Sequence, residues 1–226
     1  AKYGVNSIPA TYLLDGQGYL WTSSDSGSTF TKGGRIQDEP KGLLQNSSML
    51  IRTVPGKEGH LWIPLDQCQS WQTGGYSRNG LALTEDGGKT FTRFPAVNLA
   101  TAVGLGKAAP GASYYTIFIW GAANGGPVGI YRSTDKGASW ERVNDDAHQF
   151  GGPGNAGIVQ GDLNVFGRVY MTSIGRGLIC GTPSSNTGVS ERPRTARTAS
   201  SIERIGRNLR IVAAGVPSLR LELRDA

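Results

Sequence analysis

Short apolar stretches separated by small and polar residues run along the first 190 positions of the chain. Four of them are rich in β-branched, aromatic or other apolar residues and are bounded by Gly, Pro or Ser: residues 49–54, 60–64, 115–120 and 168–172. The three- to four-residue spacing of an amphipathic helix is absent from the sequence before residue 190. The pattern therefore predicts an all-β fold.

An eight-residue motif occurs three times between these stretches. Its copies are Ser23-x-Asp25-x-Gly27-x-Thr29-Phe30, Thr84-x-Asp86-x-Gly88-x-Thr90-Phe91 and Ser133-x-Asp135-x-Gly137-x-Ser139-Trp140. An apolar segment precedes each copy, at residues 18–21, 80–83 and 129–131, and each aromatic residue is expected to open a further strand. The unit reads as strand, tight turn, strand.

The motif is an Asp-box pattern, and its residue types favour a structural role. An Asp side chain can accept hydrogen bonds from backbone N–H groups a few residues ahead, and Gly adopts dihedrals that other residues avoid, so that the aromatic residue is directed inward. We expect Asp25, Gly27, Asp86, Gly88, Asp135 and Gly137 to be scaffold, since the same residues recur in the same turn. The aspartates are 61 and 49 residues apart, which suits a β-propeller of three to four blades with all three turns on one rim.

Composition and charge limit the classes of function that the sequence suggests. The chain of 226 residues has 34 Gly and 11 Pro and a net charge of +6, but eight Arg against four acids lie in residues 190–226. The rest is close to neutral, so we do not expect nucleic-acid binding. The apolar runs are far shorter than the roughly 20 residues of a membrane span, and the first residues lack a signal-peptide pattern. Cys68 and Cys180 could form one disulfide bridge or remain two thiols.

Three segments follow from this reading. Residues 1–183 are predicted to be a partial propeller, residues 184–203 an Arg-, Ser- and Thr-rich linker, and residues 204–226 a short β tail with two strands.

Longer strings between the motif copies resemble glycoside hydrolase family 74, the xyloglucanases and related endo-β-1,4-glucanases. They are VPGKEGHLWIPL (54–65), TAVGLGKAAPGASYYTIFIWG (101–121), GIYRSTDKGASWERVNDDAHQFGG (129–152) and GDLNVFGRVYMTSIGRGLICG (161–181). The similarity runs in order over residues 12–181. Departures from the family pattern are the long connection at residues 66–80, and Cys180 at a position where an aromatic residue is common.

The resemblance implies two seven-bladed propellers with a xyloglucan cleft between them and inverting hydrolysis by two aspartates of early blades. This chain resembles only late blades of the second propeller, and it contains no Gly-Asp-Ile-Gly-Gly-Phe type of segment. Both catalytic aspartates are therefore expected to be missing, together with the N-terminal propeller. The final residues resemble the start of a C-terminal sorting domain of secreted polysaccharidases, which implies an extracellular protein; an unrelated appended hairpin is the alternative.

Five residues are candidates for contact with a glucan. Trp71 and Tyr76 lie in a Gly- and Ser-rich segment without an evident core, Trp120 ends a predicted strand, and Asp146 and His148 lie in the NDDAHQF string. No spacing indicates a metal site, a cofactor or a catalytic nucleophile. The alternative function is a non-catalytic Asp-box propeller that binds glycan or protein.

Overall fold

A computed structural model describes residues 10–36, 51–66, 80–148, 150, 157–173 and 177–183, together with the backbone of three strands between residues 201 and 222. The chain divides into two compact units, Ala1–Pro183 and Ser184–Ala226, which we describe separately. Every regular element in the described residues is a β-strand, and none is a helix that could cross a membrane.

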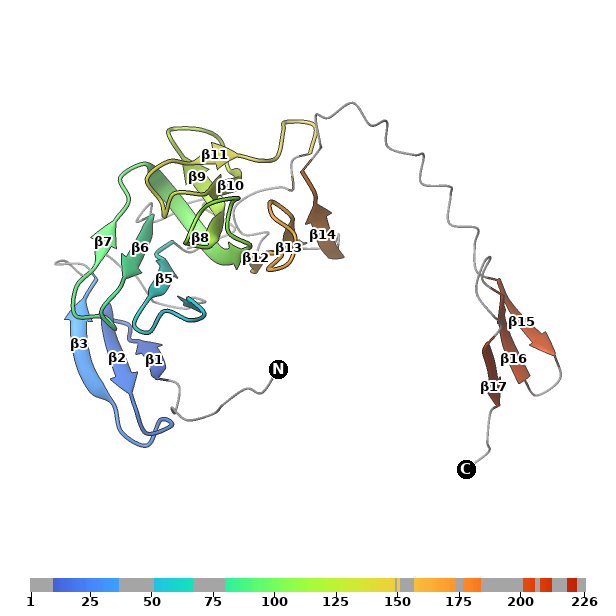
Figure 1. The fold of residues 1–226 in the computed structure, drawn as a ribbon, viewed down its shortest axis with the longest axis horizontal. Coiled ribbons are helices and arrows are strands. Elements are labelled where there is room, and N and C mark those ends of the chain that lie inside the picture. The colour runs from blue at the N-terminus through green and yellow to red at the C-terminus, as the bar shows by residue number, and fades with distance from the viewer. Residues whose placement is uncertain are drawn as a thin grey trace. The chain divides into compact units, whose positions relative to one another are not determined.

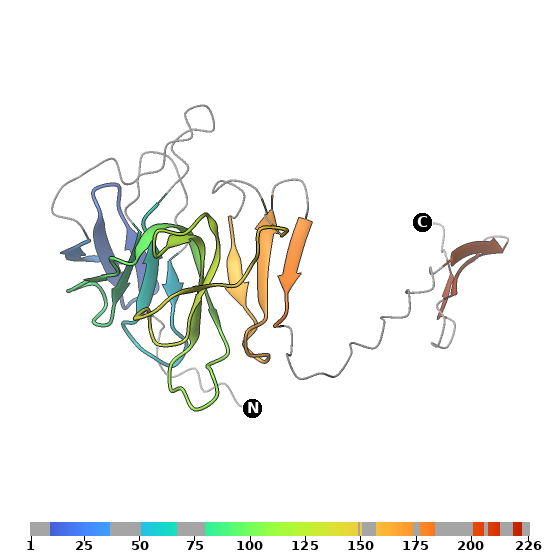
Figure 2. The same cartoon turned by 90° about the horizontal axis from the view of Figure 1, so that it is seen from above.

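Four antiparallel sheets in the first unit follow one another along an arc (Figure 1). The first contains β1 (Thr11–Leu14), β2 (Tyr19–Ser23) and β3 (Thr31–Arg35), and the second contains β4 (Arg52–Thr53), β5 (Leu61–Pro64), β6 (Leu81–Thr84) and β7 (Thr92–Arg93). The third contains β8 (Val97–Gly106), β9 (Thr116–Ala123), β10 (Gly129–Ser133) and β11 (Glu141–Arg142). The fourth contains β12 (Val159–Gly161), β13 (Val169–Ser173) and β14 (Gly177–Gly181), beside the third in Figure 2. The prediction of an all-β propeller is confirmed.

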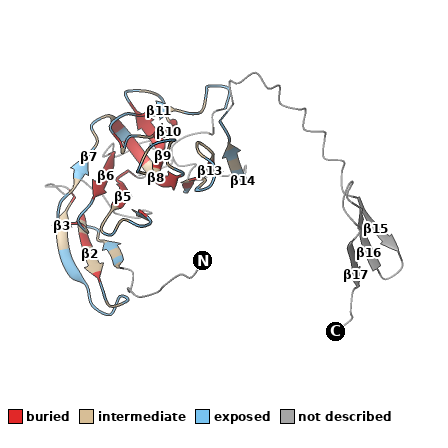
Figure 3. Cartoon of the chain, in the orientation of Figure 1, coloured by how far each residue is buried: buried red, intermediate tan, exposed pale blue. Residues whose placement is uncertain are grey.

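Three apolar clusters fill the interfaces between the four sheets, one cluster at each interface. On β9, Ile117 and Ile119 pack toward the second sheet, whereas the alternate residues Phe118 and Trp120 pack toward the fourth. Between the first two sheets, Leu20 of β2 packs with residues of β5 and β6. The middle sheets are therefore buried on both faces, which explains why their strands read as continuous apolar runs (Figure 3).

The second and third motif turns contact the preceding sheet. The Thr22 hydroxyl donates to the Gly87 carbonyl oxygen at 3.1 Å, and the Gly34 N–H donates to the Gly88 carbonyl oxygen at 2.6 Å. The first turn has no such neighbour among the described residues, and Phe30 is 38% exposed. The expectation that every motif aromatic points inward is therefore wrong for Phe30, because only the later turns pack against an earlier sheet.

The second unit contains three antiparallel strands, β15 (Ser201–Ile205), β16 (Asn208–Val212) and β17 (Leu219–Glu222). The sequence predicted two strands here. The additional strand, β15, begins inside the segment expected to be a linker. It was not predicted because its apolar residues, Ile202 and Ile205, are few and lie among polar neighbours.

Candidate functional site

The three motif turns have one hydrogen-bond pattern. In the second copy, the Thr84 hydroxyl donates to Asp86 Oδ1 at 2.9 Å and accepts the Gly88 N–H at 2.8 Å. Asp86 Oδ1 also accepts the Thr90 N–H at 3.0 Å, and Oδ2 accepts the Thr90 hydroxyl at 2.6 Å. The same bonds recur around Asp25 and Asp135. Each carboxylate is therefore occupied in closing its own turn.

These bonds favour the ionised carboxylates. Donation from Thr29 and Ser23 lowers the pKa of Asp25 from 3.8 to about 2. Burial raises the pKa of Asp86, but hydrogen bonds from Thr90 and its neighbours outweigh it and lower that pKa. The pKa of Asp135 is lowered in the same way. A carboxyl held ionised is poorly suited to act as a general acid at neutral pH.

We expect the motif turns to lose stability in acid. Because the folded pKa of Asp25 is below its unfolded value, its contribution is complete above about pH 4 and is lost as the pH falls through about 2. Urea unfolding followed by tryptophan fluorescence at pH 7 and pH 2.5 should show Asp25→Asn less stable than wild type at pH 7, with a clearly smaller difference at pH 2.5. An equal difference at both pH values would contradict this role.

The opposite rim carries the other set of connections. The motif turns join β2 to β3, β6 to β7 and β10 to β11, so in these antiparallel sheets the β5–β6, β9–β10 and β11–β12 connections lie at the other ends of the strands. Trp120, Asp146 and His148 lie in or beside these connections. Trp71 and Tyr76 lie outside the described residues.

The start of the β11–β12 connection is a hydrogen-bonded turn that presents His148. Asp145 Oδ1 accepts the His148 backbone N–H at 2.8 Å and lies 2.6 Å from His148 Nδ1. The His148 hydrogen bonds lower the pKa of Asp145. With Nδ1 bonded to a carboxylate, Nε2 of this exposed ring is left to interact with another molecule.

Asp146 points to a different partner. Its Oδ1 accepts a hydrogen bond from Arg142 Nη1 at 2.6 Å, while most of its side chain is exposed. The adjacent residues Asp145 and Asp146 thus bind different partners. The carboxylate of Asp146 remains open to solvent on one side.

Trp120 lies in the core. It is 1% exposed and packs in the cluster with Phe118, Ile130 and Met171 between the third and fourth sheets. The structure does not support sugar stacking by Trp120, because no face of its ring is accessible. Its position near the strand end did not reveal that a further sheet covers it.

Asp66 is a buried carboxylate on this rim that the sequence analysis did not single out. It is 2% exposed, and its Oδ2 accepts the N–H groups of Gly80 at 2.6 Å and Ala100 at 2.9 Å. The Asp66 N–H donates to the Ala100 carbonyl oxygen at 3.0 Å. Asp66 therefore joins the second sheet to β8 of the third.

The described part of the chain holds no group of three or more His, Cys, Asp or Glu side chains that could bind a metal ion. Cys180 is a free, exposed thiol, and Cys68 lies outside the described residues.

Comparison with known proteins decides the family. No protein-family model matches the chain. A xyloglucanase of Acetivibrio thermocellus is 38% identical over 198 residues, covering 84% of this chain and 21% of the relative. A family 74 enzyme of Niastella koreensis superposes with a TM-score of 0.62 and 42% identity, over 75% of this chain and 22% of that structure. This chain belongs to glycoside hydrolase family 74.

A second family 74 structure, a xyloglucanase of Xanthomonas campestris, superposes with a TM-score of 0.60 at 26% identity, over 79% of this chain and 23% of that structure. The chain spans about a fifth of the length of the curated relatives it matches. The resemblance drawn from the strings between the motif turns is confirmed, and the chain corresponds to part of a family 74 protein.

Proposed function

We propose that this chain is part of a secreted glycoside hydrolase acting on xyloglucan or a related β-1,4-glucan. Its sheets supply one wall of the substrate cleft, and the catalytic acids belong to another part of the protein. The observation that carries the proposal is the 38% identity to a xyloglucanase across most of this chain. The repeated turns are then Asp boxes, and the sheets are late blades of the second family 74 propeller.

The contacts of three carboxylates support the proposal that this chain forms a cleft wall without catalytic acids. Inversion needs two carboxyl groups about 6.5 to 9.5 Å apart on opposite sides of a glycosidic bond. Asp145 and Asp146 are adjacent and bonded to His148 and Arg142, whereas Asp66 is buried against backbone N–H groups. Each of these three carboxylates is therefore engaged by neighbouring groups of the described chain.

The rim opposite the Asp boxes is the proposed contact surface. His148, held through Nδ1 by Asp145, offers Nε2 to a sugar hydroxyl, and the open side of Asp146 can accept a hydroxyl hydrogen. Trp71 and Tyr76 belong to the neighbouring β5–β6 connection and are proposed to stack on sugar faces. Export rests on the resemblance of the C-terminal tail to a sorting domain.

Affinity electrophoresis in gels loaded with xyloglucan tests this surface. We expect weak retardation of the wild-type chain, with a Kd on the order of 1 mM or above, because a few contacts must offset the entropy of ordering a flexible polymer. Trp71→Ala, Tyr76→Ala and His148→Ala should each reduce the retardation.

His60→Ala is the matched control, since His60 is the last residue of the β4–β5 connection on the motif rim. It should migrate as the wild type does. Equal retardation of the wild type and the His148 and Trp71 variants would remove this rim from the substrate site. Equal retardation in a gel loaded with DNA would indicate that the Arg-rich tail binds as a simple polycation.

A further inference from the structure

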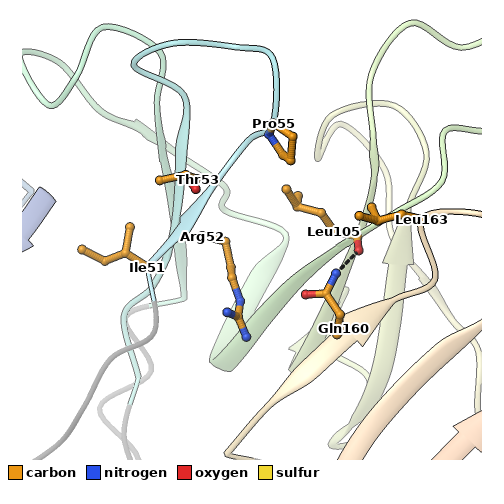
Figure 4. Close-up of a pocket in the computed structure, with 7 residues that line it drawn as sticks. All are labelled: Ile51, Arg52, Thr53, Pro55, Leu105, Gln160 and Leu163. Atoms are coloured by element: carbon orange, nitrogen blue, oxygen red, sulfur yellow. Dashed lines mark hydrogen bonds between the residues drawn. The ribbon is translucent and has the colours of Figure 1, made fainter. Parts of the chain in front are cut away.

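A small cavity lies where the innermost described strands of three successive sheets meet. Its volume is about 230 Å³, and it is lined by residues of β4, β8 and β12 and by residues that flank β4 and follow β12. Figure 4 shows Arg52, Leu105 and Gln160 converging on it from these three strands. The cavity is near the motif rim and so is separate from the proposed glucan contacts on the opposite rim.

Arg52 brings an unneutralised cation to this cavity. Its Nε donates to the Val103 carbonyl oxygen at 3.0 Å. This hydrogen bond joins the second sheet to the third and holds the guanidinium group in place. Within the described residues, no carboxylate pairs with Arg52, and its terminal nitrogens have no hydrogen-bond acceptor. Burial lowers the pKa of Arg52, with no acidic neighbour to oppose it. A partly buried guanidinium with free forked donors is a natural partner for a carboxylate.

Gln160 supplies the complementary acceptor. Its Nε2 donates to the carbonyl oxygens of Leu105 at 2.5 Å and Gly161 at 3.1 Å, so both amide hydrogens are used. The side-chain oxygen remains, and Figure 4 shows it facing the guanidinium of Arg52. An oxygen acceptor beside a guanidinium suits a ligand that carries a hydroxyl next to its carboxylate.

The remaining walls are mostly apolar. Ile51, Pro55, Leu105 and Leu163 line the cavity, with the hydroxyl residue Thr53 at its edge. Such walls accept the C–H surface of a small ring or short carbon chain while the polar groups orient it.

We propose that this cavity binds a small hydroxy-carboxylate, of which a uronic acid is the sugar representative. The carboxylate accepts from the terminal nitrogens of Arg52, and the adjacent hydroxyl donates to the side-chain oxygen of Gln160. This site is distinct from the proposed contact with neutral glucan, and its test uses no xyloglucan.

The test is a titration of the 226-residue chain followed by two-dimensional NMR of its backbone N–H groups at constant ionic strength. The probes are D-glucuronate, D-glucose, acetate and inorganic phosphate. We expect glucuronate to shift signals of β8 and β12 with a Kd on the order of 1 mM. Acetate should bind several-fold more weakly, since it lacks the hydroxyl, and glucose should cause no shift.

Two variants assign the contacts. Arg52→Gln should weaken glucuronate binding at least tenfold, whereas Arg132→Gln, which removes an arginine already paired with Glu141, should leave it unchanged. Glucuronate binding that is equally strong without Arg52 would overturn the proposal, as would phosphate binding as tightly as glucuronate.

A third variant keeps the proposal testable if Arg52→Gln does not fold. Gln160→Leu retains Arg52 and its bond to Val103 but removes the acceptor, so the preference for glucuronate over acetate should disappear. An undiminished preference in this variant would overturn the assignment of the hydroxyl contact.

Discussion

Gly88→Ala is expected to destabilise the chain by about 3 kcal/mol or more, as the sum of backbone strain and overpacking. Gly88 has a φ of 92°, and a Cβ there would lie 2.9 Å from Leu20 Cβ and closer still to the end of that side chain. Leu20 is fully buried between the first and second sheets, so it has no space into which to move.

Gly27→Ala is the matched control. Gly27 occupies the same motif position with a φ of 88°, but a Cβ there would meet only Phe30, at 3.9 Å. It should cost about 1 to 2 kcal/mol, from the backbone alone. Urea unfolding of both variants measures the difference, and equal losses would show that the second motif turn does not pack tightly against the first sheet.

The second large effect is expected at Asp66. Asp66→Ala leaves the buried N–H groups of Gly80 and Ala100 without their acceptor, and each such group costs about 1 to 3 kcal/mol. We therefore expect a loss of about 2 to 6 kcal/mol, a large part of the 5 to 15 kcal/mol typical of a folded domain.

Asp66→Asn distinguishes the acceptor from the charge. Its side-chain oxygen can still accept a hydrogen bond, so we expect a smaller loss than for alanine in the same unfolding measurement. If alanine and asparagine were both tolerated at this position, Asp66 would not join the second and third sheets. A buried carboxylate invites a catalytic interpretation, and this pair of variants tests the structural one.

The middle strands could be predicted from the sequence because their apolar residues alternate between two buried faces. The segment 115–120 predicted most of β9, and the motif spacing correctly indicated which strands the turns connect. The turn chemistry of Asp25, Asp86 and Asp135 was also predictable, since all its donors lie within four residues.

The inner strands β8 and β12 were harder to predict. β8 contains Ala and Gly where the middle strand β9 contains large residues, and a Cβ on Gly104 would collide with the carbonyl oxygen of Val159 on β12. Close approach of successive sheets therefore removes the bulky residues that normally reveal a strand.

Site residues whose roles depend on contacts between sheets could not be recognised from their neighbours in the sequence. Arg52 reaches Val103 across 51 positions, and Asp66 reaches Ala100 across 34. Trp120 was misjudged for the same reason, since the fourth sheet that covers it is distant in sequence. By contrast, the Asp145–His148 pair is local, although its bonding depends on a turn that the NDDAHQF string alone did not specify.

The central claim is that these sheets form the wall of a family 74 cleft and hold no catalytic acids. Reducing-sugar release from xyloglucan tests it in two samples: the 226-residue chain alone, and the Acetivibrio thermocellus xyloglucanase with its matching segment replaced by residues 10–183 of this chain. We expect no release by the chain alone, because one side of an inverting site cannot complete the reaction, and measurable release by the folded chimaera. Robust turnover by the chain alone would contradict the account and would assign catalysis to Asp145, Asp146 or Asp162, the residue that follows β12.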